Sequence, residues 1–402
     1  MRYVCYLLAG LAINAVSISR CNAADHIEIV REVLLERGLP AMPKQLVPTN
    51  DGDIIVAGGF SNKIPWATRV DADGKVRWRY LMEMEQWQPG DGDASYESAA
   101  TLPDDSTVLS GFTTVPVPGR STRATVGLLS HLDQTGKVIS HRQLFPQGDH
   151  SFGGIYLRRS VPWGDGVVVI GETGRARKVA DDYVLDSFFW LIALNATGEI
   201  KWEKLIPNTD PRPLSDGFPL VGVAATPGHE LVLVASDSEK RASVMERGRR
   251  VIRLNDKGDI VGERFFPGSL LLARQVNPKS EITLFPTMRL GENGVTMWTV
   301  SSDLANARQL AGSTEWIFSE AACRSSTGAF VLAGSVRGTH KAAIAWLDAE
   351  LKTTQTHVFQ PEDASGWVAD ILPTAKPDEF VTVRHIAPHS GGGAALTFVK
   401  IK

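Results

Sequence analysis

Short runs of alternating apolar and polar residues recur along most of the chain, which is typical of half-buried β-strands. Four segments share one form, in which a β-rich run, a tight polar turn ending in glycine and a second β-rich run follow each other. They are Ala67–Leu81, Gly127–Leu144, Phe189–Ile206 and Arg250–Phe266. Because glycine takes the left-handed conformation of such turns without steric cost, each segment predicts a β-hairpin.

A second hairpin pattern precedes each of these segments, as an apolar strand, a short turn and another apolar strand ending in small residues. These four copies are Lys44–Gly59, Ser98–Gly111, Arg158–Gly171 and Val223–Ser236. Three more follow at Phe285–Val300, Ser319–Gly334 and Ala369–Val383, which makes seven. Two hairpins make a four-stranded unit, and the units recur about every 60 residues, a period close to that of propeller blades. The sequence therefore predicts an all-β chain that forms a single seven-bladed β-propeller.

The last unit ends at Lys402 with three strands, so its outermost strand is missing. The segment His26–Leu35 has no strand partner near it in sequence, and pairing it with the last strand would close the ring and cover an exposed edge. An amphipathic helix is the alternative for this segment. The fifth unit is thin, because the strands after Thr299 must fit within Ser301–Gly312, so six or eight blades are alternatives.

Residues 1–24 have the features of an export signal: Arg2, the apolar run Tyr3–Val16 and the small and polar run Ser17–Ala24. The apolar run is short for a membrane span, which predicts a cleaved signal peptide and a periplasmic or secreted protein. The mature domain would be 25–402, with 25–37 as the closing strand. An uncleaved anchor is one alternative. Lipid attachment at Cys21 is another, and the preceding Arg20 fits it poorly.

Composition narrows the functional classes. The 402 residues include 42 Lys and Arg against 45 Asp and Glu, a formal charge of −3, which argues against a nucleic-acid partner. No segment after the signal is long and apolar enough to predict a transmembrane helix. Signal removal would leave Cys323 without a disulfide partner, and the sequence has no Cys/His cluster with metal-ligand spacing. We therefore expect no metal.

The unit resembles the short β-propeller repeats that are common in exported bacterial proteins. The closest copies are Val167–Thr173 with Phe189–Trp202, and Ile54–Gly59 with Ala67–Trp78. The resemblance implies the fold and export. It does not imply an activity, because the shared residues specify strand edges, turns and tryptophan packing.

Two segments also look like the docking motif of quinoprotein dehydrogenases. Ala193–Trp202 and Arg69–Trp78 have the general form of that motif, but each is one residue short before its glycine. In the first segment Asn195 also replaces the expected acidic residue. We therefore predict no quinone and no other cofactor.

The lengths of the connections distinguish the two faces of the predicted ring. Turns inside the a–b and c–d hairpins are short, whereas the b–c and d–a connections, such as Gly174–Ser187 and Glu83–Ser95, are long. Long loops on a rigid scaffold commonly carry binding residues, and interfaces favour arginine, tyrosine, tryptophan and methionine. The predicted partner-binding residues are Trp87, Asp91, Asp93, Arg120, Arg123, Arg175, Arg177, Lys178, Asp182, Tyr183, Lys240, Arg241, Met245 and Arg247.

These observations favour a non-catalytic, protein-binding propeller in the periplasm or outside the cell. A specific form is an immunity protein that neutralises a toxin acting in the periplasm, such as a secreted lipase effector. A hydrolase or lyase is an alternative, which would use carboxylates of the central channel. The residues expected on the innermost strands are Lys44, Glu97, Arg158, Glu320 and Asp370. An envelope scaffold is a further alternative.

Overall fold

The computed structural model describes residues 27–37, 41–60, 64–82, 93–116, 123–148, 153–179, 182–207, 220–225, 230–241, 244–267, 270–272, 281–286, 295–301, 303–312, 317–325, 329–336, 341–348, 353–359, 366–374, 376, 378–386 and 392–401. The predicted signal peptide, 1–24, lies outside these residues, so export stays a prediction. Within the described part of the chain, no helix has the length and apolar character needed to span a bilayer.

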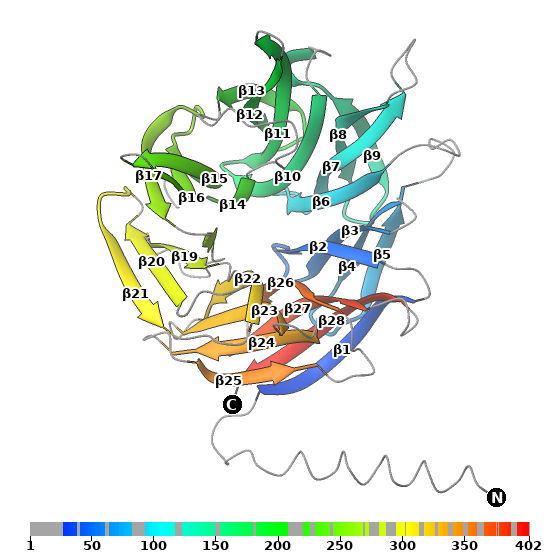
Figure 1. Ribbon diagram of the computed structural model, residues 1–402. Coiled ribbons are helices and arrows are strands. Elements are labelled where there is room, and N and C mark those ends of the chain that lie inside the picture. Colours follow the sequence, from blue (N-terminus) through cyan, green and yellow to red (C-terminus); the bar gives the residue numbers. More distant parts are fainter. Residues whose placement is uncertain are drawn as a thin grey trace, which may run out of the picture.

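The described strands form seven four-stranded antiparallel sheets arranged around a central axis (Figure 1). Blade 1 consists of β2 (Ala41–Pro48), β3 (Ile54–Phe60), β4 (Pro65–Val70) and β5 (Val76–Leu81). Blade 2 consists of β6 (Ala94–Thr101), β7 (Thr107–Pro116), β8 (Arg123–Leu132) and β9 (Val138–Leu144). Blade 3 consists of β10 (Gly153–Trp163), β11 (Gly166–Val179), β12 (Asp182–Leu194) and β13 (Ile200–Pro207). The first strand of each blade lies nearest the axis. The seven-bladed propeller predicted from the repeats is confirmed.

The remaining blades follow the same order. Blade 4 consists of β14 (Leu220–Ala225), β15 (Leu231–Arg241), β16 (Val244–Leu254) and β17 (Ile260–Pro267). Blade 5 consists of β18 (Leu270–Leu272), β19 (Glu281–Pro286), β20 (Val295–Ser301) and β21 (Ala307–Gly312). Blade 6 consists of β22 (Ile317–Arg324), β23 (Phe330–Val336), β24 (Lys341–Leu347) and β25 (Thr353–Val358). Blade 7 is β26 (Val368–Pro373), β27 (Glu379–Ile386), β28 (Gly393–Ile401) and β1 (Ile27–Arg37).

The first described strand closes the ring, as the strand count predicts. Strand β1 pairs antiparallel with β28 from Ile27 opposite Ile401 to Arg37 opposite Gly393, and the two strands lie side by side in Figure 1. The helical alternative for this segment is therefore wrong. Because β1 comes from the other end of the chain, backbone hydrogen bonds between the two ends join the ring.

Blade 5 differs from the prediction in its strand assignment. The segment Phe285–Val300 was expected to form the inner hairpin of this blade, but it contains parts of β19 and β20, which are the second and third strands. The innermost strand is β18, with three residues, Leu270–Leu272. A strand this short has too few positions for an alternating pattern, so the sequence does not show it.

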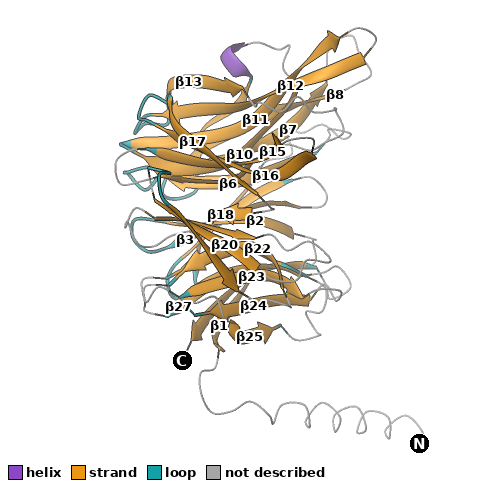
Figure 2. Cartoon of the chain, turned by 60° about the vertical axis from the view of Figure 1, so that its left-hand side comes forward, coloured by secondary structure: helices purple, strands orange, loops and turns teal. Residues whose placement is uncertain are grey.

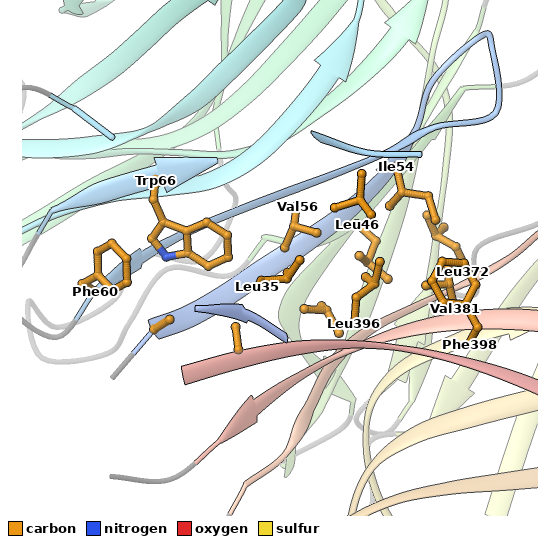
Figure 3. Packing of buried hydrophobic residues seen from close by; sticks show 14 residues of the cluster. Leu35, Leu46, Ile54, Val56, Phe60, Trp66, Leu372, Val381, Leu396 and Phe398 are labelled. Carbon is orange, nitrogen blue, oxygen red and sulfur yellow. The ribbon is translucent and has the colours of Figure 1, made fainter. Parts of the chain in front are cut away.

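The hydrophobic core lies between adjacent sheets. Figure 3 shows the cluster between blades 7 and 1, in which Leu35 of β1 packs with residues of both blades. Trp66 of blade 1 is fully buried in this cluster, and its ring centroid lies 5.9 Å from that of Phe60. Each blade therefore depends on its neighbours to bury its apolar faces, which favours a closed ring over separate domains.

The tight turns pack on the outer strands of neighbouring blades. Gly136, in the β8–β9 turn of blade 2, has a φ of 84° and lies on the Trp78 indole of blade 1, where an added Cβ would come within 2.8 Å of the ring. At the closure, Arg31 Nη2 of β1 donates a hydrogen bond of 2.6 Å to the Ala72 carbonyl in the β4–β5 turn of blade 1. The closing strand thus also meets its neighbour through a tight turn.

Candidate functional site

The two faces of the ring differ in the connections that they carry. Figure 2 shows short turns, in teal, along one side of the ring and a long hairpin, labelled β12, that extends on the opposite side. The b–c connections, predicted as long loops, are largely paired strands. The last described pairs are Pro116 opposite Arg123, Val179 opposite Asp182, and Arg241 opposite Val244. We call the side of the ring that bears these three hairpins the hairpin face.

Register explains why the predicted loop Gly174–Ser187 forms strands. Within it, every residue from Gly174 to Val179 has a partner across the hairpin, including Arg175 opposite Asp186. Opposite charges at directly facing positions stabilise a strand pair. The sequence analysis took this whole segment as a connection between strands and therefore missed the strand extension.

The structure places the predicted partner-binding residues in two main groups. One group lies on the β11–β12 hairpin of blade 3 and the other on the β15–β16 hairpin of blade 4. The first consists of Arg175, Arg177, Lys178, Asp182 and Tyr183, and the second of Lys240, Arg241, Met245 and Arg247. Asp93 precedes β6 and Arg123 begins β8, whereas Trp87, Asp91 and Arg120 lie outside the described residues.

A second set of charged residues occupies the innermost strands. Six of these strands have a register shift at the corresponding place, where one extra residue interrupts the pairing. The extra residues are Lys44, Glu97, Arg158, Val221, Glu320 and Ala369. A β-bulge releases a residue from the ladder and changes the direction of its side chain. The bulges explain why Lys44, Glu97 and Arg158 can interact across blades.

These bulged residues form a chain of charges across three blades. Glu97 of blade 2 lies between two cations, with Lys44 Nζ of blade 1 at 3.8 Å from Oε1 and Arg158 Nη1 of blade 3 at 3.3 Å from Oε2. Arg158 Nε is also 3.5 Å from Oε2 of Glu172, on β11. The other carboxylate oxygen of Glu172 accepts a hydrogen bond from the backbone N–H of Leu220, on blade 4.

Glu172 has the most unusual electrostatic environment in this chain of charges. Burial raises its pKa to about 7 from an ordinary 4.5, while Arg158 and the Leu220 N–H act in the opposite direction. Sequence analysis did not select this residue. The sequence feature that could have identified Glu172 is its position, since this carboxylate directly follows the apolar run Val167–Ile170 and Gly171 in a predicted strand.

Asp370, which the sequence analysis grouped with the channel carboxylates, makes its described contacts with backbone N–H groups. It is 4% exposed, and its Oδ2 accepts a 2.8 Å hydrogen bond from the Leu46 N–H of blade 1. Ser98 has a similar role between blades 2 and 3, since its Oγ accepts a 2.7 Å hydrogen bond from the Ser160 N–H. These side chains join neighbouring blades by satisfying backbone groups of the innermost strands.

The two carboxylates in this chain of charges are poorly placed for acid–base catalysis. The side chains of Glu97 and Glu172 are 9% and 1% exposed, and both interact with Arg158 instead of facing open space. General acid–base catalysis requires a carboxyl group within hydrogen-bond reach of the substrate. The side chain of Glu320 lies outside the description. Among the described residues, no three His, Cys, Asp or Glu side chains form a group that could hold a metal ion.

Comparisons with known proteins give distant structural similarities. No family model matches the sequence, and no curated protein does. A protein of unknown function from Dyadobacter fermentans aligns over 94% of this chain and 99% of its own, with 11% identity and a TM-score of 0.48. A Hadza microbial sialidase aligns over 89% and 65%, with 10% identity and a TM-score of 0.46. A gluconolactonase from Xanthomonas campestris aligns over 90% and 99%, with 11% identity and a TM-score of 0.38. Likenesses this weak carry no argument about activity.

Proposed function

We propose that this protein is an exported, non-catalytic propeller that binds another protein through the hairpin face. The observation that supports the proposal is the reach of the hairpins of blades 3 and 4. Among the described residues, the innermost strands of these blades pair as far as Gly174 and Ala235, whereas β11–β12 and β15–β16 continue to Val179 and Arg241. Both hairpins therefore extend past the described part of the innermost strand beside them.

Two features of these extensions favour a protein partner. Isolated two-stranded hairpins are only marginally stable, but these two continue directly from four-stranded sheets. Their sequences also combine both signs of charge with Tyr183 and Met245, residue types that are enriched in protein interfaces. Polar positions on a rigid support give specificity, while the large side chains supply contact area.

Shortened hairpins test the proposal. Because Arg175 faces Asp186, replacing residues 176–185 with Asn-Gly would close the hairpin with a two-residue turn and leave the blade intact. The same replacement of residues 238–247 would join Asp237 to Gly248. We expect the full chain to capture a partner from envelope extract and each shortened chain to capture at least tenfold less.

The matched control is a change on the opposite face of blade 4. Asp256 and Lys257 are exposed in the β16–β17 turn, and replacing both with alanine should leave partner capture unchanged. Thermal unfolding of every variant establishes that the blades remain folded. Equal capture by the shortened and full-length hairpins, with unchanged unfolding, would contradict the proposal.

The proposed export has its own test. N-terminal sequencing of protein from the periplasmic or secreted fraction should show a chain that begins at Ala24 or Asp25. A chain that retains Met1 in the membrane fraction would instead support the uncleaved anchor.

A narrower form of the proposal is an immunity protein that neutralises a toxin acting in the periplasm, such as a secreted lipase effector. The purified propeller should then inhibit the captured enzyme at equal molar amounts, and the shortened hairpins should not. Capture of several unrelated envelope proteins without inhibition would favour the scaffold alternative. Hydrolysis or elimination by the purified propeller itself would favour the hydrolase or lyase alternative.

A further inference from the structure

The outermost strand of each blade ends its sheet at the rim of the ring. In blade 6 this strand is β25, and within the described part of the chain its one strand partner is β24. The free edge of such a strand can pair with a strand of another molecule, and proteins commonly protect it with charged side chains. The seven outer strands can therefore be compared for that protection.

Charged residues occur in every described outer strand except β25. They are Arg77 and Arg79 in β5, Arg142 in β9, Lys201, Glu203 and Lys204 in β13, Glu263 and Arg264 in β17, Arg308 in β21, and Glu28, Arg31, Glu32, Glu36 and Arg37 in β1. Strand β25 consists of threonine, glutamine, histidine and valine. Burial and the charge of Arg384 lower the pKa of its His357, so this ring is neutral at pH 7.

The composition and geometry of β25 also suit strand pairing. Threonine and valine favour strands, and β25 contains neither proline nor glycine, which would interrupt a ladder. Its register shift falls at Thr354, so Gln355–Val358 pair regularly with β24. The side chains of Thr354, Thr356 and Val358 are exposed. Strand β25 is therefore the least protected of the described outer edges.

The absence of charge favours a second copy of this chain as the occupant of this edge. A contact about a two-fold axis places the same surface of both copies together. A charged outer strand would bring its own charges into that contact, where each needs an opposite partner to offset its desolvation. Strand β25 brings no formal charge, and threonine pairs across antiparallel strands stabilise pairing through hydrogen bonds.

We propose that two copies of this protein associate by antiparallel pairing of their β25 strands, which joins blade 6 of one copy to blade 6 of the other. A two-fold axis centred on the strand places Gln355 or Thr356 opposite its own copy. In both registers, Thr356 of one copy lies opposite Thr354 or Thr356 of the other. The contact is on the rim of blade 6, whereas the hairpins of the proposed function belong to blades 3 and 4, so the two proposals are independent.

Sedimentation velocity of the intact protein tests the association. Stable complexes bury about 1,600 Å² in total, and one pair of short strands provides less, so we expect a weak dimer that forms between about 5 and about 500 μM. Thr356→Lys should weaken it about tenfold, because like charges would lie close together. Thr356→Glu should have the same effect.

Mixing and a matched control separate pairing from misfolding. An equimolar mixture of Thr356→Lys and Thr356→Glu should associate again, because the two copies then carry opposite charges at the contact. Gln143→Lys changes an exposed, uncharged position in β9, the outer strand of blade 2, and should leave the association unchanged. The chain with residues 176–185 shortened should also associate as the wild type does.

Hydrogen exchange locates the contact. The amides of residues 353–358 should exchange more slowly at the higher protein concentration, whereas those of β9 should not change. A protein that stays monomeric over this range would overturn the inference, as would a dimer that both Thr356 variants leave intact. Lack of recovery in the mixture would also overturn it. Protection of β25 in a monomeric propeller by a captured protein would replace the second copy with a foreign strand.

Discussion

Replacing Glu172 with glutamine should remove one identifiable part of the pH dependence of folding. Burial raises the pKa of Glu172 to about 7, so the folded protein holds this proton more tightly than the unfolded chain, where the ordinary value is 4.5. Between these two pH values unfolding releases the proton, so rising pH favours the unfolded state. This contribution of Glu172 therefore makes the wild-type protein less stable as the pH rises from about 4.5 to about 7.

The size of the effect follows from the two pKa values. Each pH unit between them corresponds to about 1.4 kcal/mol, so the separation corresponds to about 3 kcal/mol. The Glu172 side chain is 1% exposed, so solvent screening reduces this figure little. Glutamine cannot ionise but has nearly the same shape. Its substitution should increase the relative stability of the protein progressively from pH 4.5 to pH 8.

Urea denaturation at intervals between pH 4.5 and 8 measures this difference. Subtracting the wild-type free energy of unfolding from that of Glu172→Gln cancels the contributions of other groups, including the buried histidines. We expect the difference to increase by about 3 kcal/mol across this range. A constant difference would refute the reasoning. A decrease with pH would also refute it, because attraction to Arg158 would then outweigh burial.

Three further experiments test the packing. In urea denaturation, Gly136→Ala should cost about 3 kcal/mol, because the added Cβ clashes with an indole and the residue has a φ of 84°. Gly52→Ala, at a φ of 87° with no atom within 4 Å, should cost about 1 kcal/mol. Equal losses in the two variants would contradict this reasoning. Glu32→Ala should cost about 2 kcal/mol because it removes a carboxylate that pairs with the buried Arg384 guanidinium, and adding Arg384→Met should recover most of the loss in a double-mutant cycle. No recovery would contradict a charge effect. Cys323, which is fully buried, should react with a maleimide only after unfolding, and rapid native labelling would contradict its position.

The sequence predicted the fold well because the strands and turns of this chain repeat. The glycine turns and apolar runs identify the blades, and the incomplete last unit identifies the role of residues 27–37. The prediction was wrong for one very short strand and for one hairpin rich in charged residues. Strand β18 has three residues, and the charged residues of Gly174–Ser187 occupy a paired hairpin that was interpreted as a loop.

The candidate sites were less accessible to sequence analysis. Lys44, Glu97 and Arg158 were correctly expected on innermost strands, but their mutual contacts depend on bulges, which shift the register at one residue. Residue type alone does not show which side of a bulge a carboxylate occupies. Asp370 was therefore grouped with Glu97, although Asp370 holds a backbone N–H of the next blade.

The bulge assigns two roles to two different residues: one joins neighbouring blades through a backbone hydrogen bond, and the other interacts with charged groups of the channel. Within blade 2, two consecutive residues lie at the bulge of β6, and the second, Ser98, joins this blade to blade 3 by accepting the backbone N–H of Ser160. The first, Glu97, is released from the ladder and interacts with the cations of both neighbouring blades. An unsatisfied buried N–H costs about 1 to 3 kcal/mol, so the second position is constrained by stability. The bulged position carries no such backbone duty. The chemistry of the channel can therefore change at the bulges while the contacts that hold the ring stay in place.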